Sequence, residues 1–312
     1  GAYSLVALTE DTLMAARDPL GIRPLCIGKL DGGWIIASES CALDHLGATY
    51  MRELEPGEVV IIDPQGFHSS VWTGATGRRA LCVFELIYFA RPDSLLDNQL
   101  VHSVRQELGA QLAREHPVEA DLVIGIPDSS TAAAVGYARE SGIPFSEGLV
   151  KNRYVGRTFI EPEQRMRDLG VRQKFNPLTE VIAGQRIVVV DDSIVRGTTT
   201  PHVVGLLRKA GAAEIHMRVC APPIKHPCFM GVDMATRQEL IAANQSVEEI
   251  RQFIDADTLG YLDVKGLMKV VGGTDGGFCD ACFTGNYPVP VQLELTKLVL
   301  EEPPAELELL SD

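Results

Sequence analysis

Two adjacent carboxylates stand between an apolar run and a hydroxyl-rich turn. Ile187–Val190 consists of four β-branched residues, which predicts a fully buried strand, and Asp191 and Asp192 follow it directly. The turn Gly197–Thr200 then leads into a helical pattern. Backbone N–H groups, hydroxyls and the positive end of a helix dipole suit phosphate, whereas paired carboxylates suit ribose hydroxyls or a hydrated divalent cation. Together they predict a site for a phosphorylated sugar; the alternative is an ordinary turn with a threonine N-cap.

A second loop of this kind ends the apolar stretch Asp121–Ile126 and begins the helical pattern Thr131–Ser141. Its small hydroxyl residues at a helix N-terminus suit an anion, although a serine N-cap would also explain them. Ligands of open α/β sheets bind beyond the carboxyl ends of the strands. We therefore expect both loops to contribute to one site, with Asp128, Ser129 and Ser130 from this loop.

The segment Lys151–Ile160 is rich in positive and amide side chains although the whole chain has a net charge of −14. It has no helical stripe and contains a glycine near its middle, which predicts a loop. Arginine makes bidentate contacts with phosphate groups, and a lid that closes over them excludes water. The segment therefore predicts a lid over pyrophosphate, against the alternative of a solvated surface loop.

The stretch Asp191–Thr199 resembles the signature with which type I phosphoribosyltransferases bind phosphoribosyl pyrophosphate (PRPP), in the form found in amidophosphoribosyltransferases. Lys151–Ile160 resembles the catalytic loop of that family. The resemblance implies the first step of de novo purine synthesis, in which PRPP and glutamine (or ammonia) give phosphoribosylamine, pyrophosphate and glutamate. It assigns catalysis to Lys151, Arg153 and Arg157, Mg²⁺ to Ser129, Asp191 and Asp192, and PRPP binding to Asp128, Ser129, Ser130, Asp191, Asp192, Ser193, Arg196, Gly197, Thr198 and Thr199.

The chain has seven cysteines, in spacings unlike those of a small disulfide scaffold, which indicates a reducing, cytoplasmic setting. Cys279 and Cys282 form a CxxC pair, a pattern that suits zinc or redox chemistry. In the iron–sulfur subclass of the family, cysteines in the contexts of Cys82, Cys228, Cys279 and Cys282 are the four ligands of a [4Fe–4S] cluster. The resemblance implies that cluster here, in a structural or oxygen-sensing role; a zinc site with four cysteines is the alternative.

Residues 1–76 are predicted to be β-rich, with short apolar strands between Gly, Pro and Asp turns. Arg17–Leu25 resembles part of the glutaminase domain of N-terminal-nucleophile amidotransferases, in which a cysteine at the N-terminus attacks glutamine. Gly1 occupies that end here, so we expect a truncated domain and do not expect glutamine use. Cys26 and Cys41 are predicted to be small buried residues.

After a polar connector, strand and helix patterns alternate, which is typical of a parallel sheet. Val83–Ala90 is predicted as a strand, and Thr236 with Glu239 and Ser246 with Glu249 as the capping boxes of two short helices. The predicted fold class is α/β: a type I phosphoribosyltransferase sheet flanked by helices, preceded by a partial glutaminase domain. The predicted domains are residues 1–76, residues 77–290 with the iron–sulfur region, and an acidic tail at 291–312.

The acidic composition argues against nucleic acid as a partner, and no apolar run approaches a membrane span. The family resemblance implies a homotetramer and feedback inhibition by AMP and GMP. Two other functions stay open at this point: a phosphoribosyltransferase for a purine or pyrimidine base, and a non-catalytic PRPP sensor. The first would need a base-recognition segment in place of the lid, and the second a nucleic-acid-binding face.

Overall fold

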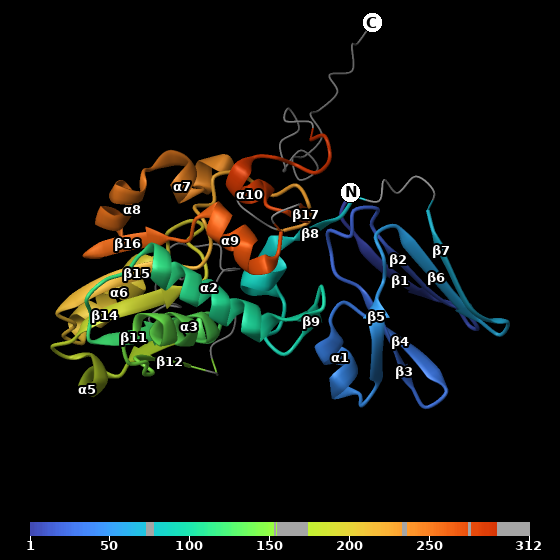
Figure 1. The fold of residues 1–312 in the computed structure, drawn as a ribbon, viewed down its shortest axis with the longest axis horizontal. Coiled ribbons are helices and arrows are strands. Elements are labelled where there is room, and N and C mark those ends of the chain that lie inside the picture. Colours follow the sequence, from blue (N-terminus) through green and yellow to red (C-terminus); the bar gives the residue numbers. More distant parts are fainter. Residues whose placement is uncertain (73–77, 153, 155–173, 233–235, 274–275, 292–312) are drawn as a thin grey trace, which may run out of the picture.

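The computed structural model describes residues 1–72, 78–152, 154, 174–232, 236–273 and 276–291. Figure 1 shows a β-rich N-terminal region beside a larger region in which helices surround a sheet. This division agrees with the predicted fold class. Arg153, Arg157 and the tail beyond residue 291 lie outside the described residues, so what the sequence predicts for them stays a prediction.

The β-rich region contains antiparallel sheets in the orders β1-β2-β6-β7 and β4-β3-β5. Because side chains alternate along a strand, Ala15 and Val60 face inward, where they pack with Leu25, Ile27 and Leu54. Cys26 and Cys41 are 2% and 5% exposed, as predicted. The elements are β1 (Ser4–Leu8), β2 (Leu13–Arg17), β3 (Cys26–Leu30), β4 (Gly33–Ala37), α1 (Ser40–His45), β5 (Thr49–Glu53), β6 (Glu58–Asp63) and β7 (Gly66–Val71).

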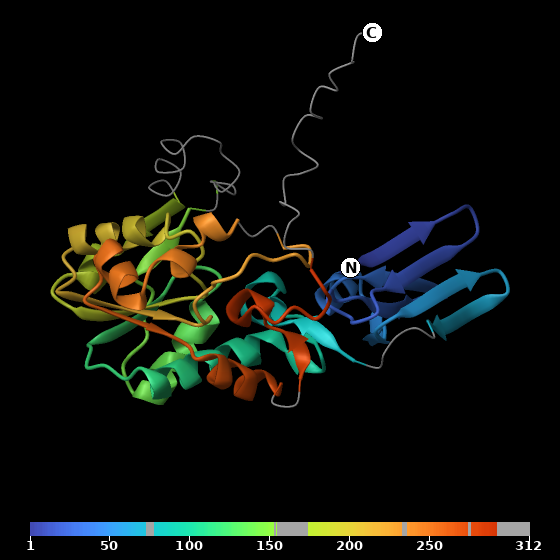
Figure 2. The same ribbon diagram turned by 90° about the horizontal axis from the view of Figure 1, so that it is seen from above.

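A parallel sheet in the order β11-β14-β15-β16 forms the centre of the α/β region. Successive residues of β14 point to opposite faces, so Val188 and Val190 enter one core while Ile187 and Val189 enter the other. Helices α2, α3 and α9 pack on the first face and α6, α7 and α8 on the second, as Figure 1 and Figure 2 show. The strands are β11 (Leu122–Gly125), β14 (Arg186–Asp191), β15 (Glu214–Val219) and β16 (Thr258–Tyr261). The helices are α2 (Val101–Glu115), α3 (Thr131–Ser141), α6 (Thr200–Lys209), α7 (Ile241–Asn244), α8 (Val247–Phe253) and α9 (Val264–Val271).

The two regions meet around Glu39, whose carboxylate accepts hydrogen bonds from the Arg91 N–H at 2.7 Å and the Ser94 hydroxyl at 2.8 Å. Beside it, Arg23 pairs with Glu85 at 3.0 Å. A cavity of about 440 Å³ opens here, with Arg23, Glu39 and Glu85 in its wall. Polar and charged groups therefore join the regions.

The prediction of a strand at Val83–Ala90 is wrong, because the structure has a π-helix, η1 (Glu85–Phe89), in its place. A short apolar run fits a buried helix as well as a strand, so its composition could not decide. The guanidinium of Arg105 donates to the carbonyls of Leu86 at 3.0 Å and Ala90 at 2.7 Å, which satisfies backbone groups of this helix.

Of the two capping boxes predicted for the short helices of residues 236–253, the structure contains one. Ser246 and Glu249 form a reciprocal capping box at the start of α8, as predicted. Thr236 precedes the 3₁₀ helix η3 (Arg237–Glu239) and makes no capping hydrogen bond through its side chain, so that box is wrong. The strand β16 was not anticipated either, because its sequence Thr-Leu-Gly-Tyr is short and carries a central glycine.

Among the described residues, no helix is long and apolar enough to cross a membrane.

Candidate active site

The loop that follows β11 and the diacid turn that follows β14 lie side by side. The two strands are parallel neighbours, with Gly125 opposite Val190 in the register, and the Ile126 N–H donates to the Val190 carbonyl at 2.9 Å. Their carboxyl ends therefore share one edge of the sheet. This placement brings Asp128, Ser129 and Ser130 next to Asp191 and Asp192.

Hydroxyl groups surround the two carboxylates. Ser130 Oγ donates to Asp191 Oδ1 at 3.4 Å, and Ser193 Oγ donates to Asp192 Oδ1 at 2.7 Å. Ser129 also hydrogen-bonds to Asp192. The structure thus brings the three predicted serines of both loops into contact with the diacid.

Burial governs the electrostatics of the diacid. Desolvation, followed by the charge of Asp192, raises the pKa of Asp191 well above its ordinary value. Desolvation also raises the pKa of Asp192, against the opposing effects of the Ser129 and Ser193 hydrogen bonds and the charge of Arg105. Two neighbouring carboxylates with raised pKa values favour a cation or donor-rich ligand, because either would stabilise their charged forms.

Lys151 at the end of β12 (Leu149–Lys151) reaches the first loop, where its Nζ lies 2.7 Å from Asp128 Oδ2. The strand β12 pairs with β13 (Phe175–Pro177), and the Asn152 N–H donates to the carbonyl of Lys174 at 2.8 Å. The predicted lid segment therefore starts at the edge of the site. Its other assigned residues, Arg153 and Arg157, lie outside the described part of the chain.

Lys174 is a further charged residue at this edge of the sheet, and its sequence context did not predict a place in the site. Burial, and then the charge of Lys151, lowers the pKa of its ammonium group, whereas the charges of Asp191, Asp192 and Asp128 oppose that shift. The lysine therefore lies within the field of the same three carboxylates. Its signal in the sequence was weak, because it stands at the end of a run of basic residues and carries no motif of its own.

The turn before α6 has the form that a phosphate site requires. Gly197 has φ +70°, a backbone conformation that favours glycine. A Cβ at this position would lie 2.6 Å from Ile241 Cδ1, so the end of that side chain would have to move. Thr198 and Thr199 immediately precede α6, and the Thr199 side chain makes no capping hydrogen bond within the described residues. Arg196 lies at the surface, 3.5 Å from Glu239. Backbone N–H groups and hydroxyls at this positive helix end suit an anion.

The four cysteines named in the sequence analysis gather in a separate region. Strand β8 (Ala80–Cys82) pairs in parallel with β17 (Gly277–Cys279), which places Cys82 opposite Cys279. Cys282 lies in α10 (Ala281–Thr284), and its carbonyl accepts the N–H groups of Lys225 and His226, each at 3.0 Å. That contact draws the Cys228 segment alongside, and the charge of Cys228 affects the pKa values of both Cys279 and Cys282.

The donor set of this region fits an iron–sulfur cluster in its chemistry. Burial raises the pKa of Cys82 to about 12 and also raises that of Cys282, so bound iron would be needed to hold these sulfurs as thiolates. Among the described residues, no group of three or more His, Cys, Asp or Glu side chains is arranged to hold a metal ion. A [4Fe–4S] cluster does not need such a group around one ion, because each of its four irons takes only one cysteine thiolate.

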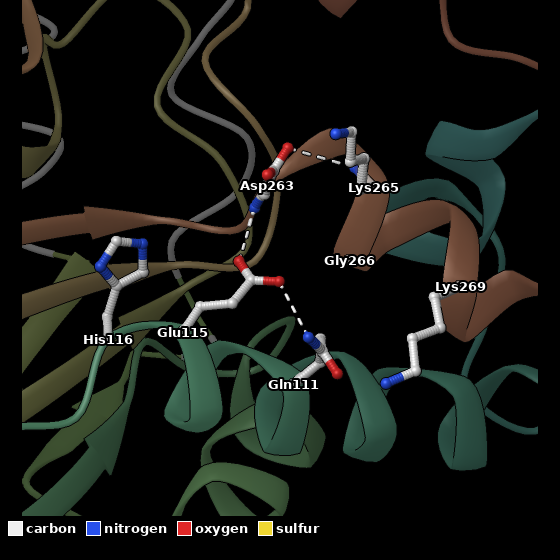
Figure 3. Close-up of a pocket in the computed structure, with 7 residues that line it drawn as sticks. All are labelled: Gln111, Glu115, His116, Asp263, Lys265, Gly266 and Lys269. Carbon is white, nitrogen blue, oxygen red and sulfur yellow. Dashed lines mark hydrogen bonds between the residues drawn. The ribbon is translucent and has the colours of Figure 1, made fainter.

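A cavity of about 490 Å³ between α2 and α9 contains none of the predicted site residues (Figure 3). Glu115 accepts hydrogen bonds there from the Asp263 N–H at 2.7 Å and from the Gln111 amide at 2.9 Å. The bond between Glu115 and Asp263 joins α2 to the start of α9. We place the candidate active site at the diacid edge of the sheet.

The family model described as the phosphoribosyl transferase domain matches residues 92–227, which contain β11, β14 and both loops of the candidate site. Curated relatives of greater length are amidophosphoribosyltransferases: that of Mycobacterium bovis is 51% identical over 96% of this chain, and that of Bacillus subtilis is 52% identical over 93%. The chain spans 58% and 62% of the length of these two relatives.

Solved structures agree with the sequence relatives. The glutamine PRPP amidotransferase of B. subtilis, complexed with ADP and GMP, has a TM-score of 0.87 and 51% identity, and covers 95% of this chain. A structure described as the allosteric regulatory enzyme of purine biosynthesis has a TM-score of 0.88 and 50% identity over 97% of the chain. This chain covers 66% of each of those two chains.

Proposed function

We propose that this chain carries the phosphoribosyl-transferring site of an amidophosphoribosyltransferase and forms phosphoribosylamine from PRPP. The observation that carries the proposal is the placement of the Gly125–Ser130 loop beside Asp191 and Asp192 on neighbouring strands. The similarity to amidophosphoribosyltransferases over more than nine tenths of the chain supports the same assignment.

In the proposed reaction, the nitrogen of ammonia forms a bond to C1 of the ribose while the bond from C1 to pyrophosphate breaks. The leaving pyrophosphate takes the electron pair, and the new amine loses a proton to solvent. Asp191 and Asp192 would bind the ribose hydroxyls and favour the cationic sugar, while the Arg196–Thr200 turn would hold the 5′-phosphate. Lys151, with Arg153 and Arg157, would stabilise the leaving pyrophosphate.

A Mg²⁺ ion fits the oxygen donors of Ser129, Asp191 and Asp192, because it prefers carboxylate and hydroxyl ligands and would offset their mutual repulsion. When bound, it would supply positive charge to the pyrophosphate oxygens. The residues of the chain would orient C1 and, through the lid segment, exclude water.

Ammonia is the nitrogen donor that we propose for this chain by itself. Cys26 and Cys41 lie inside the β-rich region, and burial raises the pKa of Cys26 to about 12, so its thiol is a poor nucleophile at neutral pH. The domain boundaries, the tetramer, feedback by AMP and GMP and the cytoplasmic location are further parts of the proposal. The relative complexed with ADP and GMP supports a nucleotide-responsive enzyme.

The test is pyrophosphate release from PRPP and Mg²⁺ with different acceptors. We expect release with ammonium salts and no release with adenine, hypoxanthine, uracil or orotate. Release that depends on one of the bases would replace this function with that of a base phosphoribosyltransferase. PRPP binding without turnover of any acceptor would favour a sensor.

We further propose a [4Fe–4S] cluster on Cys82, Cys228, Cys279 and Cys282. Anaerobically purified protein should be brown and hold about four irons per chain. Cys282→Ser should lose the iron, whereas Cys41→Ser, a cysteine from the other region, should keep it. Colourless protein with one zinc per chain would contradict the cluster in favour of zinc.

A further inference from the structure

The hydroxyl of Tyr261 is buried without a hydrogen-bond partner among the described residues. The residue is 6% exposed, and its backbone carbonyl lies 2.8 Å from His116 Nε2, so its main chain is anchored while its side chain is unsatisfied. A buried hydroxyl without a partner loses the free energy of its bonds to water. Among the described residues, no backbone or side-chain group offsets this loss for the Tyr261 hydroxyl.

The register of the sheet points that side chain toward the diacid. Asp191 on β14 is opposite Val219 on β15, and Val219 is opposite Tyr261 on β16. Paired residues of parallel strands lie on the same face, so the three side chains stand in one row. Two strand spacings put the outer Cα atoms roughly 10 Å apart. A tyrosine and an aspartate can span that distance over the small valine between them.

Two further observations support this geometry. Burial, and then the negative charge of Asp191, raises the pKa of Tyr261. Tyr261 also shares its core with Ile241, the residue against which Gly197 of the phosphate turn packs. The hydroxyl therefore lies beneath the candidate site.

We propose that Tyr261 is a positioning residue, whose hydroxyl donates a hydrogen bond to the Asp191 carboxylate when PRPP occupies the site. This bond would hold one carboxylate oxygen in place while the other accepts a ribose hydroxyl. The inference rests on the proposed function, because it requires that Asp191 bind the ribose.

The chain offers a matched control in Tyr137, which is fully buried on the opposite face of the sheet and donates its hydroxyl to the His116 carbonyl at 2.9 Å. Tyr137→Phe removes a hydrogen bond that the free protein already makes. Tyr261→Phe removes a hydroxyl that the free protein leaves unpaired. Both substitutions delete a tyrosine hydroxyl, one with and one without a hydrogen-bond partner in the free protein.

The experiment measures the dissociation constants of PRPP and of ribose 5-phosphate by calorimetry, together with the melting temperature of each variant in the free state. We expect Tyr261→Phe to weaken both ligands about tenfold, as for one hydrogen bond to a charged group, without a lower melting temperature. We expect Tyr137→Phe to lower the melting temperature and to leave both affinities unchanged.

Unchanged PRPP affinity in Tyr261→Phe would overturn the inference. If the melting temperature of that variant also fell, the hydroxyl would stabilise the fold, through a bond to an internal water. The proposed function would still stand in that case. Failure of the unsubstituted chain to bind PRPP would reject the proposed function, and this inference with it.

Discussion

Two carboxylate sites, one in each region of the molecule, have opposite electrostatics. In the β-rich region, the carboxylate of Glu58 accepts hydrogen bonds from Arg52 at 2.7 Å through both oxygens, from the Ser69 hydroxyl at 2.5 Å and from the Glu55 N–H at 2.7 Å. Burial alone would raise the pKa of Glu58, but these bonds outweigh burial and the pKa is lowered. In the α/β region, burial wins and the pKa of Asp191 is raised.

The opposite pKa shifts distinguish a carboxylate that stabilises the fold from carboxylates that can still bind a ligand. Glu58 has partners for both oxygens inside the protein, so its charge is stabilised before anything binds. Asp191 and Asp192 repel each other and receive mainly hydroxyl and backbone donors, so a ligand or cation can still gain free energy by binding them. Substitutions at the two sites should therefore differ in their effects on activity and on stability.

Asp191→Asn should reduce ammonia-dependent pyrophosphate release by about 100-fold or more, because it removes a charge that favours the cationic ribose. Steady-state assays with saturating ammonium and Mg²⁺ measure the loss. Glu58→Gln serves as the control and should retain activity within about twofold. Equal losses in both variants would remove the functional distinction between the two sites.

Glu58→Gln should lower the free energy of unfolding by about 2 kcal/mol, because Arg52 loses its charged partner and the buried hydrogen bonds weaken. Urea unfolding at pH 7 measures this change. Replacement by glutamine keeps the size of the side chain, so packing contributes little. A loss below about 0.5 kcal/mol would mean that the Glu58 network does little for the fold.

The same two variants should respond to pH in opposite senses in chelated buffer. The folded pKa of Asp191 is raised above 3.8, so the charged aspartate destabilises the fold at pH 7, and Asp191→Asn should be more stable by on the order of 1 kcal/mol. That advantage should shrink as the pH falls toward 3.8. The deficit of Glu58→Gln should persist down to about pH 4.5 and shrink only as the pH falls through the lowered pKa of Glu58. Parallel pH profiles would refute the contrast.

Ser69→Ala should have the smallest effect, a loss of about 0.5 to 1 kcal/mol, because it removes one donor to Glu58 and leaves both Arg52 bonds in place. Its unfolding curve should lie between those of the unsubstituted chain and Glu58→Gln. A loss as large as that of Glu58→Gln would show that the serine, and not the arginine, maintains the charge of Glu58.

Much of the fold followed from local patterns. The β-branched run before Asp191, the helical pattern Thr131–Ser141 and the Ser246 capping box predicted elements that the structure contains. The prediction failed at Glu85–Phe89, where an apolar run without clear periodicity forms a π-helix whose carbonyls bind a distant arginine, Arg105. Such long-range hydrogen bonds leave no local trace in a sequence.

By itself, the sequence determined the chemistry of the candidate site. The order of a buried strand, two acids, a glycine and three threonines predicts a carboxylate pair beside a turn suited to phosphate, because these residue types and their spacing set the local backbone. Only the tertiary structure shows the further groups near that pair and how far it is buried. Lys174 and Tyr261 reach the field of Asp191 from separate elements, and the burial that raises the pKa of Asp191 depends on how those elements pack. Side-chain burial is a property of the packed sheet, so no single segment of the chain encodes it.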